Sequence, residues 1–167
     1  MTAHDTQSPV GPFDVRALHV ALNAERARRA TSWAAIARET HVSSATIGRT
    51  SKADDLEADG MLQLVRWLGL APESFTRDRP EPVPMATSLQ QAPGILRVDT
   101  RSLYAVIDEQ RSDRSLTWPE VAECTVAQSR LTALRRGGRS TAQTLLAAAR
   151  WLGRGSLEFV RVDHPGA

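Results

Sequence analysis

Apolar residues recur at helical spacing along much of the chain. Between residues 15 and 29, Leu18 and Leu22 share one face, and Asp14 precedes them where an N-cap belongs. A second amphipathic stretch covers residues 58–70, and a short helical turn then begins at Pro72. The pattern therefore predicts a helix at each of these places.

Residues 31–52 fit two shorter helices with a tight turn between them. Ser32 and Ser43 stand where N-caps would start the two helices. The first helix carries an apolar stripe at i, i+3, i+4 and i+7, formed by Trp33, Ile36, Ala37 and Thr40. In the second helix, Ile47 faces inward and leaves an outer face free. This arrangement is typical of a helix-turn-helix.

The segment resembles the helix-turn-helix of the phage repressor and Cro family (Xre type). Ala37, Val42, Ser43 and Ile47 stand where that motif has alanine, valine, serine and an aliphatic residue. The sequence departs from the motif at His41, where the family usually has glycine. The resemblance implies a compact five-helix domain that places its second motif helix in the major groove of DNA.

The second half of the chain repeats the first. An alignment with a single gap in the turn, offset by 85 residues before it and 84 after it, gives seventeen identities, including Arg66-Trp67-Leu68-Gly69 over Arg150-Trp151-Leu152-Gly153. We call residues 13–77 repeat one and residues 98–161 repeat two. Pro119 enters the first motif helix of repeat two in its first turn, where a missing N–H is tolerated.

These observations predict an all-α protein of two tandem five-helix domains, one in each repeat. Residues 1–12 are expected to form a flexible N-terminal arm, and residues 162–167 a C-terminal tail. Residues 78–97 contain four prolines and no sustained apolar pattern, so a linker without structural elements is expected there, one that imposes no fixed arrangement on the domains.

Composition and charge bear on where the protein acts and on how it could bind a partner. The chain is 41% hydrophobic and 24% charged, with a formal charge of only +2, so the distribution of charge matters more than its total. It has no apolar run long enough for a membrane span and no signal-peptide pattern at its N-terminus. A cytoplasmic, nucleoid-associated protein is therefore expected.

The sequence offers little for catalysis or metal binding. Cys124 is the only cysteine and is expected to be partly exposed, and the four histidines lack ligand spacing. The four tryptophans are interpreted as packing residues rather than a stacking platform. No catalytic residue, metal, cofactor or small-molecule ligand is expected.

The candidate DNA contacts lie on and beside the two second motif helices. Hydroxyls can hold phosphates, arginine can read guanine or bind phosphate, and Gln128 suits adenine. The set in repeat one is Ser32, Ser43, Ser44, Ala45, Thr46, Arg49 and Lys52. The set in repeat two is Thr117, Gln128, Ser129, Arg130, Thr132, Arg135, Arg136 and Arg139.

The two candidate surfaces differ in charge. Residues 43–59 carry two basic and four acidic side chains, a net −2, whereas the aligned residues 127–143 carry four basic and no acidic ones, a net +4. Repeat two is therefore expected to supply more of the salt-dependent affinity for DNA.

The function expected from the sequence is a sequence-specific regulator of transcription that binds double-stranded DNA. Because the second motif helices differ, its site should be asymmetric and bipartite, and fold analogy favours a repressor of phage or bacterial origin. The alternative is a protein-interaction module, such as an antitoxin or an adaptor of a DNA-bound complex. A homodimer or another protein partner is left open by the sequence.

Overall fold

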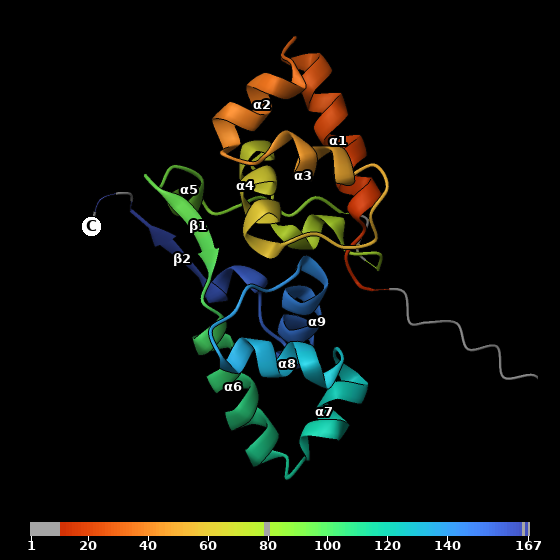
Figure 1. Ribbon diagram of the computed structural model, residues 1–167, viewed down its shortest axis with the longest axis vertical. Coiled ribbons are helices and arrows are strands. Elements are labelled where there is room, and N and C mark those ends of the chain that lie inside the picture. The colour runs from red at the N-terminus through yellow and green to blue at the C-terminus, as the bar shows by residue number, and fades with distance from the viewer. Residues whose placement is uncertain (1–10, 79–80, 165, 167) are drawn as a thin grey trace, which may run out of the picture.

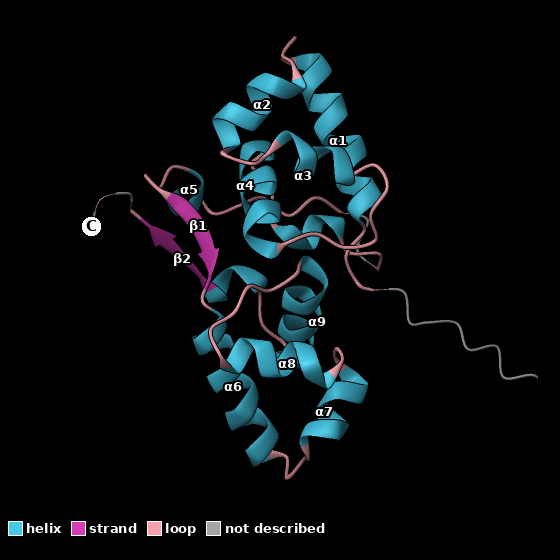
Figure 2. Cartoon of the chain, viewed as in Figure 1, coloured by secondary structure: helices cyan, strands magenta, loops and turns pink. Residues whose placement is uncertain are grey.

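The computed structural model describes residues 11–78, 81–164 and 166. It is mostly helical, as expected, with one small sheet (Figure 1 and Figure 2). Repeat one contains α1 (Val15–Arg28), α2 (Trp33–Thr40), α3 (Ser44–Arg49), α4 (Ala58–Leu68) and the 3-10 helix η1 (Pro72–Phe75). The segment between the repeats holds α5 (Thr87–Gln90) and β1 (Ile95–Val98). Repeat two contains α6 (Thr100–Asp113), α7 (Trp118–Cys124), α8 (Gln128–Arg135), α9 (Ala142–Leu152) and η2 (Ser156–Phe159), and β2 (Val160–Asp163) follows.

The helix starts in repeat one follow the local signals in the sequence. The side chains of Asp14, Ser32 and Ser43 accept hydrogen bonds from backbone N–H groups three residues ahead, as N-caps do. Gly69 ends α4 in the left-handed conformation, at φ 73°. The helices predicted at these caps are confirmed, and α1 and α4 end one or two residues earlier than expected.

The expectation that residues 78–97 carry no structural element is wrong. Met85 is buried, Leu96 in β1 is completely buried, and β1 pairs antiparallel with β2, with Leu96 opposite Val162. The strand escaped detection because the prolines lie before it and its four residues give too short an alternation. The expected tail is also partly wrong, since residues 162 and 163 belong to β2.

The expected N-terminal arm falls mainly on residues 1–10, which lie outside the described residues. Its last two residues are held by repeat one. The Arg77 backbone N–H donates to the Pro12 carbonyl at 2.9 Å, and the Arg77 side chain donates to the Gly11 carbonyl.

Equivalent contacts recur in both repeats. His19 stacks on Trp33 with ring centroids 5.5 Å apart, and Tyr104 stacks on Trp118 at 5.0 Å. Each tryptophan ring also has an arginine guanidinium over it, at aligned positions in the two repeats. The pairs are Arg26 over Trp33, Arg29 over Trp67, Arg111 over Trp118 and Arg114 over Trp151. All four tryptophans are partly buried against the core, in agreement with a packing role.

The two repeats pack together along α4 and α9, and their buried residues form one continuous hydrophobic cluster (Figure 1). Two backbone hydrogen bonds join them in a symmetric pair. Ala58 N–H donates to the Ser140 carbonyl and Ala142 N–H donates to the Leu56 carbonyl, each at 2.8 Å. Because these residues are aligned partners in the duplication, the repeats are related by an approximate two-fold axis. We call this contact the junction. It fixes the arrangement that the linker was expected to leave free.

Candidate nucleic-acid interface

In repeat one, α2 and α3 are joined by a tight turn centred on His41. His41 has φ 56°, in the left-handed region, which explains why glycine suits this position and why histidine is a departure. Val42 and Ile47 are buried in the angle between the helices. Thr50 is buried behind α3, where its hydroxyl contacts the His19 ring at 2.8 Å. The turn therefore leaves only one face of α3 in solvent.

Most of the repeat-one candidates lie on that exposed face or beside it. Ser32, Ser43, Ser44, Ala45, Arg49 and Lys52 are exposed, and Thr46 is partly buried. The hydroxyls of Ser32 and Ser43 are used as caps, and that of Ser43 also meets the Thr46 hydroxyl at 2.9 Å. Among the described residues, neither Arg49 nor Lys52 forms an ion pair. These two cations are the available charges of this face.

Repeat two builds the same helix pair with a shorter turn. Thr117 and Glu120 form a reciprocal capping box at the start of α7, and the hydrogen bonds from Thr117 lower the pKa of the Glu120 carboxyl. The turn lacks an equivalent of His41, and Thr125 ends α7 at φ −128°. Ala127 stands at the start of α8 without a side-chain cap. The residue missing from the turn of repeat two is therefore the one that corresponds to His41, which is left-handed in repeat one.

All the repeat-two candidates are exposed, but the side chains of three of them already have partners inside the molecule: Thr117 in its capping box, Arg130 and Thr132. The Arg130 guanidinium lies 3.1 Å from the Asp55 carboxylate of repeat one and 3.3 Å from the Thr141 hydroxyl. The Thr132 hydroxyl donates to the Gln128 carbonyl. Within the described part of the chain, the other three arginines, Arg135, Arg136 and Arg139, have no carboxylate partner.

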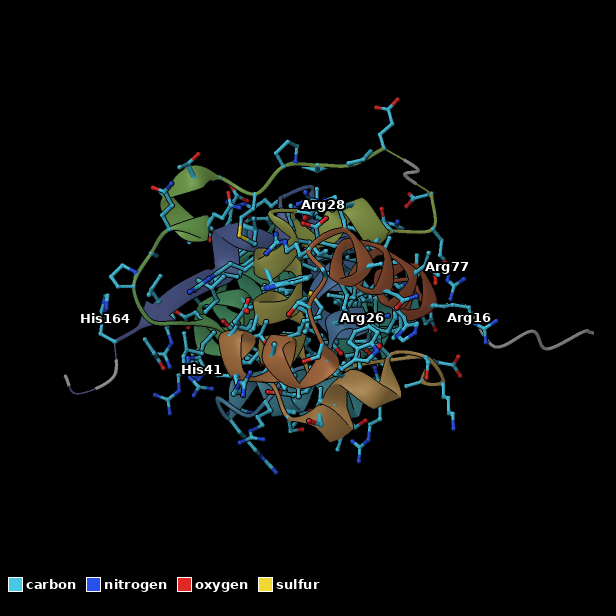
Figure 3. The ribbon with its side chains drawn as sticks, turned by 90° about the horizontal axis from the view of Figure 1, so that it is seen from above. Arg16, Arg26, Arg28, His41, Arg77 and His164 are labelled. Atoms are coloured by element: carbon cyan, nitrogen blue, oxygen red, sulfur yellow. The ribbon has the colours of Figure 1, made fainter. Side chains whose placement is uncertain are left out.

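The second helices of the two pairs face the same way. In Figure 1, α3 is drawn in front of α4 and α8 in front of α9, so both lie on the side toward the viewer. Figure 3 gives the view from above, in which the orange α2–α3 pair lies at the opposite edge from the green segment that follows η1. The two helices, one on either side of the junction, therefore lie toward the same side of the molecule.

A polar network at the junction was missed by the sequence reasoning. One Asp55 carboxylate oxygen binds Arg130, and the other accepts the backbone N–H groups of Gln143 and Leu56 at 3.1 and 2.9 Å. The Gln143 amide in turn pairs with both backbone groups of Phe13. The sequence near Asp55 does not show this role, because its partners are 75 and 88 residues away. Only its alignment with Arg139, a reversal of charge, hinted at a special role.

Residues 11–78, 81–164 and 166 contain no group of three potential metal ligands, and Cys124 is an exposed free thiol, as expected. No helix in these ranges combines the length and hydrophobicity that crossing a membrane requires. Comparison with known proteins gave no match to a family model, a curated protein or a solved structure.

Proposed function

We propose that the protein is a sequence-specific double-stranded DNA-binding regulator of transcription. Each repeat acts as one helix-turn-helix domain of the phage repressor and Cro type, with α3 and α8 as recognition helices. The proposal excludes catalysis and needs no cofactor. Its setting is the cytoplasm of a bacterial or phage-infected cell, on the nucleoid.

The observation that carries the proposal is the common orientation of α3 and α8 across the junction. Repressors of this type place two recognition helices in successive major grooves, about 34 Å apart, by forming symmetric dimers. Here one chain supplies both helices around an approximate two-fold axis, with their exposed faces turned to the same side. The duplication thus replaces the second subunit of a dimer.

Base reading is assigned to the exposed side chains that are free of internal partners. In repeat one, Arg49 suits guanine, while Lys52 suits a phosphate. In repeat two, Gln128 suits adenine and Arg136 suits guanine or phosphate. Arg130 is assigned to the junction instead, because Asp55 and Thr141 already hold its guanidinium.

An asymmetric bipartite site follows from the unlike recognition helices. Arg49 aligns with Ala133, and Arg130 aligns with Thr46, so the half-sites would be read by different side chains. A rigid reader of two half-sites would occlude promoter DNA, which is the basis for proposing a repressor. The protein-interaction alternative loses support because the acidic Asp55 and the apolar face of α4 are both used inside the molecule.

The test is selection of bound duplexes from a random library by the full chain near physiological salt. We expect one motif with two unlike halves, spaced by about one helical turn. Arg49→Ala should degrade one half and Arg136→Ala the other, at roughly 1–3 kcal/mol per lost base contact.

Arg38→Ala, an exposed change on α2 away from the recognition helices, serves as the control and should leave the motif intact. Recovery of no enriched sequence would contradict the proposal. A motif with two identical halves would contradict the asymmetric reading but retain the DNA-binding function.

A further inference from the structure

A cleft of about 380 Å³ opens at the junction beside the C-terminal end of α8. Four arginines from separate parts of the fold line it: Arg97 of β1, Arg101 of α6, Arg139 after α8, and Arg161 of β2. Asp59 and Asp99 also line it, so the lining residues carry four positive and two negative charges, a net +2.

The two aspartates are occupied by other partners. Asp59 binds Arg97 at 3.0 Å and accepts the Val98 backbone N–H at 2.9 Å. Asp99 caps α6 through both the backbone and the hydroxyl of Ser102, which lowers the pKa of its carboxyl and keeps it ionised. Neither carboxylate is within ion-pair distance of Arg101 or Arg139.

The remaining cations are only partly compensated. Asp163 lies 2.9 Å from Arg97 and 3.5 Å from Arg161. Within the described residues, Arg101 and Arg139 have no carboxylate partner. With Asp163 counted, the four arginines exceed the nearby carboxylates by one, and Arg101 and Arg139 are the two without an ion-pair partner in the described ranges. This excess of positive charge on a concave surface favours an anion.

The approximate two-fold axis supplies a comparison for this cleft. On the opposite side of the junction, the residue aligned with Arg139 is Asp55, which closes the contact by binding Arg130 and Gln143. On one side of the junction, the Asp55 carboxylate joins the two repeats. On the other side, the aligned position is occupied by Arg139.

The equivalent depression of repeat one is also built differently. It has about 280 Å³ and is lined by Arg16, Lys52 and Arg77, with Asp14 and Asp54 between them. Figure 3 shows Arg16 and Arg77 along one edge of the molecule. Here Ala53 stands where repeat two has Gly137.

Gly137 allows Arg101 to lie over the loop. A Cβ on Gly137 would come within 2.8 Å of the Arg101 Nε, and the φ of 72° favours glycine independently. The missing side chain lets the guanidinium cross the backbone at the wall of the cleft.

We propose that this cleft binds a phosphate group. The planar guanidinium group of arginine makes paired, charge-assisted hydrogen bonds to phosphate oxygens. Guanidinium groups from separate elements would bind one phosphate from different directions. The phosphate comes either from the DNA backbone or from a free phosphorylated small molecule. The first source rests on the proposed function, and the second does not.

The first arm of the test uses inorganic phosphate and the full chain. Thermal unfolding is measured in sodium phosphate and in sodium chloride of equal ionic strength. We expect phosphate to raise Tm by about 3 °C or more through preferential binding to the folded state. Arg101→Gln and Arg139→Gln should remove this rise. Arg16→Gln, which changes the aligned residue of repeat one, should keep it.

The second arm measures the salt dependence of binding to a random-sequence duplex. If the DNA backbone supplies the phosphate, Arg101→Gln should reduce the slope of log Kobs against log salt by about 0.9, and Arg16→Gln should not. Loss of the phosphate effect with an unchanged slope identifies a free phosphorylated ligand. The first arm does not depend on DNA binding, so if the protein fails to bind DNA, loss of the phosphate effect in Arg101→Gln still supports a free phosphorylated ligand.

The proposal is overturned if phosphate gives no rise in Tm beyond chloride. It is equally overturned if Arg16→Gln removes the rise as fully as Arg101→Gln, since the effect would then be a general response of surface cations.

Discussion

The two repeats keep the same residues where the backbone needs them and differ where the surface is exposed. Both begin with an aspartate cap, stack an aromatic ring and an arginine on the first tryptophan, and end the fourth helix with a left-handed glycine. By contrast, α3 and α8 share no exposed residue. The duplication has therefore preserved the scaffold while its two outer faces diverged.

The structure also reduces the contrast in charge between the faces. The sequence gives −2 for residues 43–59 and +4 for residues 127–143. However, Asp55 and Arg130 neutralise one another, and Asp59 is paired with Arg97. The charges without an ion-pair partner in the described ranges are Arg49, Lys52, Asp54 and Glu57 within residues 43–59, a net 0. Within residues 127–143 they are Arg135, Arg136 and Arg139, a net +3. The difference in charge between the two faces therefore falls from six to three.

The largest expected effect tests whether the repeats are one folding unit. Leu18→Ala and Leu103→Ala delete aligned, completely buried side chains, and each should cost roughly 2–5 kcal/mol of unfolding free energy. Because a single core spans both repeats, each variant should show one urea transition, with tryptophan fluorescence and circular dichroism coinciding. Two separate unfolding transitions, of which each variant shifts only one, would show that the repeats unfold independently. Val20→Ala, at an exposed position, is the control.

The second effect concerns affinity for DNA. Replacing Arg135, Arg136 and Arg139 with alanine should reduce the salt slope by about 2.7, and replacing Arg49 and Lys52 by about 1.8, if each cation neutralises one phosphate. Binding is followed by fluorescence anisotropy with a labelled duplex at several salt concentrations. Arg154→Ala, after α9, is the comparison variant. Equal slopes for the two sets would refute the larger share assigned to repeat two.

The third effect concerns the side of the junction where Asp55 binds Arg130 and Gln143. Asp55→Ala should cost about 1–3 kcal/mol, because it removes the acceptor of two backbone N–H groups and the partner of Arg130. Asp54→Ala changes the formal charge equally, but only the Asp54 backbone carbonyl contacts Gln143. Urea unfolding of both variants makes the comparison. Similar losses would show that charge alone, rather than the network, matters.

The smallest effect concerns the turn that only repeat one retains. His41→Gly should stabilise the protein by about 0.5–1 kcal/mol, because glycine adopts the left-handed conformation without a Cβ penalty. His41→Ala keeps that penalty and should give no gain. If the two variants unfold at the same urea concentration, the left-handed strain assigned to His41 is absent.

Local chemistry allowed much of the helical architecture to be predicted. Caps such as Asp14 and Ser43 and the glycine stop at Gly69 act within a few residues, so their effect is visible in the sequence. The repeat offset likewise located the shortened turn.

The roles of other residues became visible only when distant parts of the chain met. The four-residue strand β1 is stabilised by β2 and by α4, whose Gln63 exchanges two hydrogen bonds with Leu96 across 33 residues. In the sequence, Arg130 is a candidate for a DNA contact because it lies on the second motif helix of repeat two. In the fold, however, it binds Asp55, which is 75 residues away.

The sequence by itself determined the helices of the two repeats, because capping hydrogen bonds and apolar periodicity act within a turn or two. It also determined the duplication, which is visible as aligned identities. The tertiary structure alone decided which charges are neutralised at the junction and which remain around the cleft. The reason is physical: an ion pair depends on the distance between its groups in space, and packing α4 against α9 sets that distance.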